Sequence, residues 1–190
     1  ERSNTMSNLL VQNIKHTNGT TAATIDTAGV FSSAGHVIQT VTNRDTTATN
    51  ITSAGSFVDI TSSELTITCG IANSSYLYFA TLSAEPDLAG GSAMENYFRF
   101  VYTLNSGSTT QHNVERLIYA QSGHDDMGTA SMTPIYLFDN ISTSKGDVLK
   151  FFVQYRMSVS SSYQFNQDGL TGQPSSTDIF SSVTVQEIAT

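Results

Sequence analysis

Two runs of alternating residues, separated by a polar loop, constrain the fold of this chain more than any other feature. Residues 96–121 read NYFRFVYTLNSGSTTQHNVERLIYAQ. Phe98, Phe100, Tyr102 and Leu104 occupy every second position of the first run. A period of two is that of a β-strand with one buried face. The loop NSGSTTQ consists of turn-forming residues, and VERLIY starts a second strand, so the stretch predicts a β-hairpin.

The rest of the chain repeats this plan. Short apolar or alternating runs are separated by Gly-, Pro-, Ser- and Asn-rich turns, and no stretch has the period of an amphipathic helix. No segment repeats at a fixed spacing, which argues against a propeller or solenoid. About nine or ten short strands at regular spacing are typical of an all-β sandwich or barrel. The clearest further strands are HVIQTV, ELTITC, residues 76–82, 135–138 and 148–157, and the closing SSVTVQEIA.

One predicted strand is apolar on both faces. Residues 76–82 read YLYFATL, with no charged side chain on either face. One face of such a strand packs on the core of a sandwich, and the apolar side chains of the other face must be shielded from water by a further element. A neighbouring copy of the chain is the simplest cover, so this strand favours an oligomer. Cys69, the only cysteine, follows Leu65 and Ile67 on a predicted inward face, which indicates a buried structural thiol.

The composition excludes several classes of function. Charged residues make up 13% of the chain, and the net charge is −8. An acidic chain is a poor partner for the phosphates of nucleic acids and for anionic membrane surfaces. No run is long and apolar enough to insert into a membrane. Ser, Thr and Asn supply the polar surface instead, which suits an extended β-surface.

The first 34 residues differ in character from the remainder of the chain. HTNGTT carries Asn18-Gly19, a strong signal for a hairpin turn, between two short strand-like runs. A segment of this size is too small and too polar to fold alone. We therefore predict an N-terminal arm or anchor over residues 1–34 and a β-sandwich domain over residues 35–190.

Two parts of the sequence resemble the proteins of tailed-phage particles. The segment NIKHTNGTTAATIDTAGV resembles the start of many phage virion proteins. The stretches GHVIQTV, SFVDIT and ELTIT, with the closing SVTVQEIA, resemble phage fibre and head-decoration domains of the C1q/TNF-like jelly-roll kind.

The resemblance implies a homotrimeric jelly roll on the surface of a virion. The arm would bind other virion proteins, and the globular head would point outward. The function implied is that of a tail or head fibre that attaches to a glycan or protein of the host surface. The alternative is a capsid decoration (cement) protein that stabilises the head. In such trimers aromatic side chains pack around the threefold axis. The pool for core and interface consists of Tyr76, Tyr78, Phe98, Phe100, Phe151 and Phe152, and the other interpretation is that all six belong to the core of a single chain.

The sequence contains no catalytic motif, and we expect no enzymatic activity. None of the four histidines lies in an H-E-x-x-H or C-x-x-C context, and no G-x-S-x-G motif occurs. No cofactor is expected. Asp125 and Asp126 are the candidates for a Ca²⁺ site, because calcium prefers oxygen ligands. The alternative for this pair is an ordinary solvated turn, since the loop lacks the order of an EF-hand.

A second candidate site lies near the C-terminus. Tyr163, Phe165, Gln167 and Asp168 offer rings on which a sugar can stack, together with an amide and a carboxylate that can bond its hydroxyls. The alternative is that Tyr163 and Phe165 form a short strand and face the core.

Overall fold

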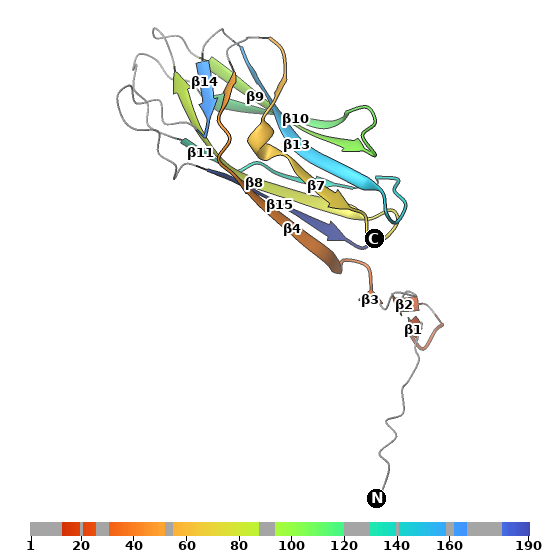
Figure 1. Cartoon of the computed structure of the whole chain (residues 1–190). Helices are drawn as coiled ribbons and strands as arrows, with labels where there is room; N and C mark the ends of the chain where they lie inside the picture. Colours follow the sequence, from red (N-terminus) through yellow and green to blue (C-terminus); the bar gives the residue numbers. More distant parts are fainter. Residues whose placement is uncertain are drawn as a thin grey trace, which may run out of the picture.

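The computed structural model describes residues 13–19, 21–25, 31–51, 55–87, 94–119, 130–139, 141–158, 162–166 and 180–190. Within these residues the chain is built from β-strands, and the single helical element is the 3₁₀ turn η1 (Thr61–Ser63). The all-β prediction is confirmed. Figure 1 shows two layers of strands facing each other, with a small third sheet beyond one end.

The first layer is an antiparallel sheet around a long central strand, β8 (Ser75–Asp87). One edge of β8 pairs with β15 (Ser181–Ile188), and β15 pairs with β4 (Val37–Asp45). β8 also pairs with three further strands, β11 (Ala130–Met132), β12 (Ile135–Phe138) and β14 (Ser162–Phe165). β14 pairs in turn with β5 (Thr49–Ile51).

The second layer is centred on β13 (Val148–Met157), which has the bounds that the sequence predicts. One edge of β13 pairs with β9 (Met94–Leu104), and β9 pairs with β10 (Thr110–Tyr119). These two strands confirm the predicted hairpin. The other edge of β13 pairs with β6 (Val58–Asp59) and then β7 (Leu65–Thr68).

Several connections between consecutive strands cross from one layer to the other. The chain passes from β7 to β8, from β8 to β9, and from β12 to β13, and each of these steps crosses from one sheet to the other. Such crossing in an antiparallel two-sheet sandwich is the connectivity of a jelly roll. The fold is therefore an antiparallel jelly-roll sandwich, as the sequence predicts.

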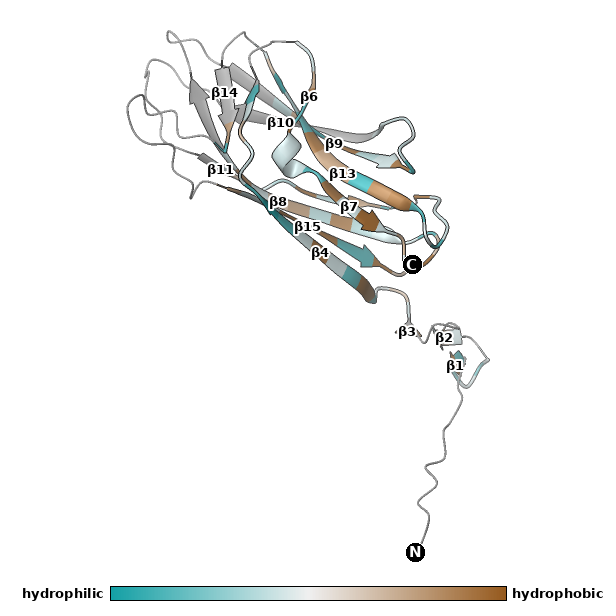
Figure 2. Cartoon of the chain, viewed as in Figure 1, coloured by the Kyte–Doolittle hydropathy of each residue, from teal (hydrophilic) through white to brown (hydrophobic). Residues whose placement is uncertain are grey.

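Alternation along the strands builds the core between the layers. On β9, Phe98 and Phe100 are buried and pack with the partly buried Tyr102, as the hairpin pattern predicts. On β15, Val183 and Val185 occupy alternate positions of the predicted closing strand and are buried as well. Figure 2 shows hydrophobic residues concentrated along β13 and the end of β7. Aromatic rings from both sheets meet inside, for example Tyr76 and Phe151 with centroids 5.2 Å apart.

The described part of the N-terminal segment forms its own sheet of β1 (Asn13–Lys15), β2 (Thr21–Ile25) and β3 (Phe31–Ser32). Gly19 closes the β1–β2 turn with a φ of +86°, and its N–H donates to the His16 carbonyl at 2.9 Å. This small sheet adjoins one end of the sandwich, where Ala23 faces a cavity shared with Ile71 and Ala189.

Strand bounds differ from the sequence prediction at two polar stretches. β4 continues to Asp45, although residues 42–49 read as a loop, because β15 supplies its hydrogen-bonding partner along the whole length. Pro86, which has no N–H to donate to a ladder, nevertheless lies inside β8 and pairs with Tyr163 of β14. Proline is tolerated where its missing N–H faces an unpaired edge, and the described pairing of β8 with β11 ends at Ala84.

Candidate interaction surfaces

The outer face of the first sheet carries a block of four apolar side chains. Leu77 and Phe79 of β8 lie opposite Leu137 and Ile135 of β12, so the four are neighbours in two adjacent rows. Ile135 is 59% exposed and Leu137 47% exposed, whereas Leu77 and Phe79 are half-buried. Contiguous exposed apolar side chains mark sites of interaction. We call these four residues the apolar face.

The same two rows continue across the sheet with uncharged polar residues. Thr184 lies beside Phe79, and Gln186 lies beside Leu77. The hydroxyl oxygens of Thr184 and Thr42 are 3.0 Å apart on the next pair of strands. No charged side chain occupies a described position in these two rows. Centres of protein interfaces are likewise depleted of charge.

The outer face of the second sheet is built differently, from cations stacked on rings. The guanidinium groups of Arg99 and Arg156 lie 4.2 and 5.2 Å from the centroid of Phe57. Arg99 donates through Nε to the Gln154 side-chain oxygen, and Gln154 donates to Asp59 at 2.5 Å. Desolvation lowers the pKa of Arg99, the charge of Asp59 opposes that change, and Arg156 adds to it. This hydrogen-bonded row ties β6, β13 and β9 together.

A buried carboxylate lies at the end of the sandwich near the N-terminal sheet. Glu187 is fully buried, and its oxygens accept from the N–H groups of Gly70 and Ile71 at 3.0 Å. The Ser74 hydroxyl at 2.9 Å and the Gln39 amide at 2.5 Å donate to it too. Donors from β4 and from the β7–β8 turn thus satisfy the charge, which gives Glu187 a structural role.

The sequence missed this carboxylate, although the alternation of β15 contains the signal. Val183, Val185 and Glu187 lie on one side of that strand. Continuing the inward pattern by one step places Glu187 inside.

The six aromatic residues of the predicted core and interface pool are buried in the single chain. Tyr76, Tyr78, Phe98, Phe100 and Phe151 belong to the core cluster. Phe152 points to the other side of β13, where it is 2% exposed and lies 4.9 Å from the Lys150 ammonium. Five of the six residues therefore lie in the core between the sheets, Phe152 is buried on the other side of β13, and the exposed apolar side chains come from other positions.

The proposed sugar-contacting set is not assembled in the described residues. Phe165 was a wrong candidate, because it is fully buried and packs edge-on against Tyr155 at 5.6 Å. The backbone of Tyr163 pairs with Ile51 and Pro86 within the first sheet. Gln167 and Asp168 lie outside the described residues, as do the calcium candidates Asp125 and Asp126.

The described residues show neither a metal centre nor a membrane-spanning helix. Among them, His, Cys, Asp and Glu form no group of three that could hold a metal ion. Cys69 is buried, as predicted. No helix in the described parts of the chain is long and apolar enough to cross a membrane.

Comparison with known proteins finds only weak structural similarity. No protein-family model matches the chain, and no curated protein sequence matches it. The Eiger TNF structure from S. frugiperda aligns with 10% identity and a TM-score of 0.35, over 75% of this chain and 92% of that one. The structure of the infectious bursal disease virus Gx strain aligns with 11% identity and a TM-score of 0.35, over 84% of this chain and 39% of that one.

Proposed function

We propose that the chain is a structural protein of a bacteriophage particle, a homotrimeric tail or head fibre whose jelly-roll head attaches to the host surface. The observation that carries the proposal is the apolar face of Leu77, Phe79, Ile135 and Leu137, which lies in two rows of the first sheet without a charged residue at their described positions. The phage assignment and the number three rest on the resemblance of the N-terminal segment and of the strand sequences to phage virion proteins.

Electrostatics favours a second copy of the chain as the occupant of the apolar face. The chain carries a net charge of −8, so two copies repel each other wherever their carboxylates come close. The two rows that contain the apolar face lack charged residues at their described positions. Copies therefore approach through this surface at the lowest electrostatic cost and remove its apolar side chains from water.

In this proposal the attachment is multivalent. Three heads on each fibre, and several fibres on each particle, convert weak individual contacts into firm attachment. The charge-poor surface of Ser, Thr and Asn suits contact with a polar host surface. The particle surface is the location that this role requires.

Sedimentation equilibrium of the purified chain tests the assembly. We expect a species of three 20.4 kDa chains. The double variant Ile135→Thr, Leu137→Thr should sediment as a monomer, because it removes the exposed half of the apolar face and places β-branched residues, which favour strands, at both positions. Val148→Thr is the matched control, since Val148 is 41% exposed on the opposite sheet. A wild-type chain that stays monomeric would contradict the trimeric fibre and favour the capsid decoration protein, which would bind its capsid through the same apolar face.

Adsorption assays separate the two roles on the particle. An antibody against the head should reduce adsorption of the phage to host cells if the chain is a fibre. A decoration protein would leave adsorption unchanged, and its removal would make the capsid sensitive to heat.

A further inference from the structure

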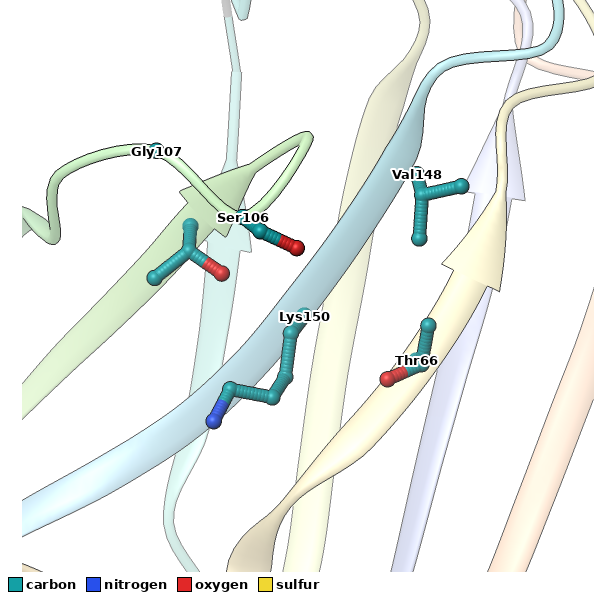
Figure 3. A pocket seen from close by; sticks show the side chains of 6 residues that line it. Thr66, Ser106, Gly107, Val148 and Lys150 are labelled. Carbon is teal, nitrogen blue, oxygen red and sulfur yellow. The ribbon is translucent and has the colours of Figure 1, made fainter.

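An open pocket of about 420 Å³ lies on the outer face of the second sheet. Thr66 of β7 and Thr103 of β9 lie directly opposite Lys150 of β13, so the three form one row across the sheet. The rim of the pocket consists of Val148 and the hairpin-loop residues Ser106 and Gly107. Figure 3 shows the hydroxyl groups of Thr66 and Ser106 directed toward the space between these elements.

The loop above the pocket is held in one conformation. Asn105 and Ser106 have φ angles of +49° and +58°, which few residues adopt. The Asn105 side chain stabilises this shape by donating to Asp147 at 2.9 Å and accepting from the Val148 N–H at 2.8 Å. A side chain at Gly107 would lie 2.9 Å from the Leu104 carbonyl, so the turn requires glycine there. The pocket wall is therefore formed before any ligand arrives, which lowers the entropic cost of binding.

The lining groups match the hydrogen-bonding pattern of a neutral polyol. Thr66, Thr103 and Ser106 each carry a hydroxyl that can donate and accept. The Lys150 ammonium lies 3.1 Å from the Glu64 carboxylate and above the Phe152 ring, and its other N–H groups can donate to a ligand. Val148, 41% exposed, offers an apolar contact for C–H groups.

The same geometry disfavours an acidic ligand. A ligand carboxylate would compete with Glu64 for Lys150, and it would approach a chain with a net charge of −8. A neutral ligand leaves the ion pair intact.

We propose that this pocket binds a neutral sugar residue with adjacent hydroxyl groups, of the kind found in surface glycans. The inference rests on the proposed attachment role for its biological meaning. The pocket lies on the second sheet and the apolar face lies on the first, so assembly through the apolar face leaves each pocket open to the outside. An assembled particle protein would then present several weak sugar sites at once.

Methyl NMR on the full chain tests the site directly, because Thr66, Thr103 and Val148 all carry methyl groups. The probes are methyl α-D-glucopyranoside, methyl α-D-mannopyranoside and methyl β-D-galactopyranoside, with methyl β-D-glucuronide as the acidic comparison. We expect at least one neutral glycoside to shift these methyl resonances saturably, with a Kd on the order of 1 mM. Lys150→Met and Thr103→Val should each weaken that binding about tenfold, the usual consequence of losing one good hydrogen bond. Lys145→Met, which removes a lysine outside the pocket, should leave it unchanged.

Three outcomes would overturn the proposal. They are the absence of a saturable shift with any of the three neutral glycosides, binding that survives Lys150→Met and Thr103→Val unchanged, and binding of the glucuronide alone. The core methyl groups of Val153 and Val185 report in the same spectra whether each variant is folded. Sedimentation of the same samples tests the assembly separately. A trimer that binds no sugar would refute the sugar pocket and leave the trimeric fibre standing. A monomer that binds sugar would refute the trimeric fibre and leave the sugar pocket standing.

Discussion

Glu187 shows how a single residue can organise one end of the sandwich. A carboxylate is expensive to bury unless donors surround it. Here the donors come from the backbone of Gly70 and Ile71, from Ser74 and from Gln39, so the residue joins β15 to β4 and to the β7–β8 turn. Gly70 permits the approach, because a side chain there would lie 3.1 Å from the Glu187 carboxylate.

We expect Glu187→Gln to lower the free energy of unfolding by about 3 kcal/mol. The amide of glutamine presents one NH₂ group toward groups that are themselves donors, which leaves a buried donor unsatisfied. Urea unfolding followed by circular dichroism measures the change. Glu64→Gln is the control, because Glu64 pairs with Lys150 at the surface and should cost less than about 1 kcal/mol. Equal losses in the two variants would contradict the structural role of Glu187.

Asp147 supports a prediction about pH. Hydrogen bonds from the Asn105 side chain and the Ser144 N–H hold the pKa of its carboxyl below the ordinary value. Because the pKa is lower in the folded chain, the stabilisation is present above the ordinary pKa of an aspartate and is lost as the pH falls through the lower folded value. NMR titration should give a midpoint for Asp147 below the ordinary value of an aspartate. In Asn105→Gly, which keeps the positive φ, the midpoint should rise; an unchanged midpoint would contradict this assignment.

At the scale of elements, the 3₁₀ turn between β6 and β7 allows the contribution of its serine hydroxyls to stability to be tested. The 3₁₀ turn η1 breaks the strand that borders β13, and Ser63 replaces part of the lost pairing. Its hydroxyl accepts from the Val153 N–H at 2.9 Å and donates to the Ile60 carbonyl at 2.6 Å. Among the described residues, the neighbouring Ser62 hydroxyl is buried without a hydrogen-bond partner.

The two serines should therefore respond in opposite ways to alanine. Ser63→Ala leaves the Val153 N–H without its acceptor and should cost about 2 kcal/mol, with faster hydrogen exchange at Val153. Ser62→Ala removes an unsatisfied hydroxyl and should be neutral or slightly stabilising. Thermal unfolding compares the two variants under the same conditions, and a larger loss for Ser62→Ala would contradict this account of the turn.

Strands in which apolar and polar side chains alternate strictly could be predicted from the sequence. Strands whose extent depends on pairing with distant strands could not. The bounds of β13 and the inward faces of β9 and β15 follow from side-chain period alone. The extension of β8 through Pro86 and the burial of Phe165 depend on pairing with distant strands, which local sequence does not encode.

The candidate sites divide in the same way. The double apolar pattern of residues 76–82 identified one half of the apolar face. The other half, Ile135 and Leu137, carries the same signal in the run IYLF, with Tyr136 and Phe138 directed inward. The pocket at Lys150 could not be predicted, because it joins residues from three strands and a loop that are far apart in the sequence.

At the scale of the whole molecule, the outer faces of the two sheets differ in chemistry. The first sheet carries the apolar face in two rows without charged residues, with Arg44 stacked on Phe180 in the neighbouring row, whereas the second presents several cations held by rings and carboxylates. A sandwich with two different outer faces can assemble through one and bind through the other. The proposed trimer and the proposed sugar pocket use this division.

The N-terminal segment should be dispensable for both the fold and the self-association of the sandwich. Two backbone hydrogen bonds join the start of the sandwich to the end of the chain. The Gly35 N–H donates to the Ala189 carbonyl, and the Ala189 N–H donates to the His36 carbonyl. Both bonds remain when residues 1–34 are removed. The apolar face also lies entirely within residues 35–190. We therefore expect the shortened chain to keep its sedimentation behaviour and to lose less than about 1 kcal/mol of unfolding free energy, since Ala23 meets Ile71 and Ala189 only as part of the lining of an open cavity. If the shortened chain becomes a monomer while the full chain is a trimer, the arm carries the assembly. The apolar face would then have to serve a different partner, and the capsid is the one that a decoration protein would provide.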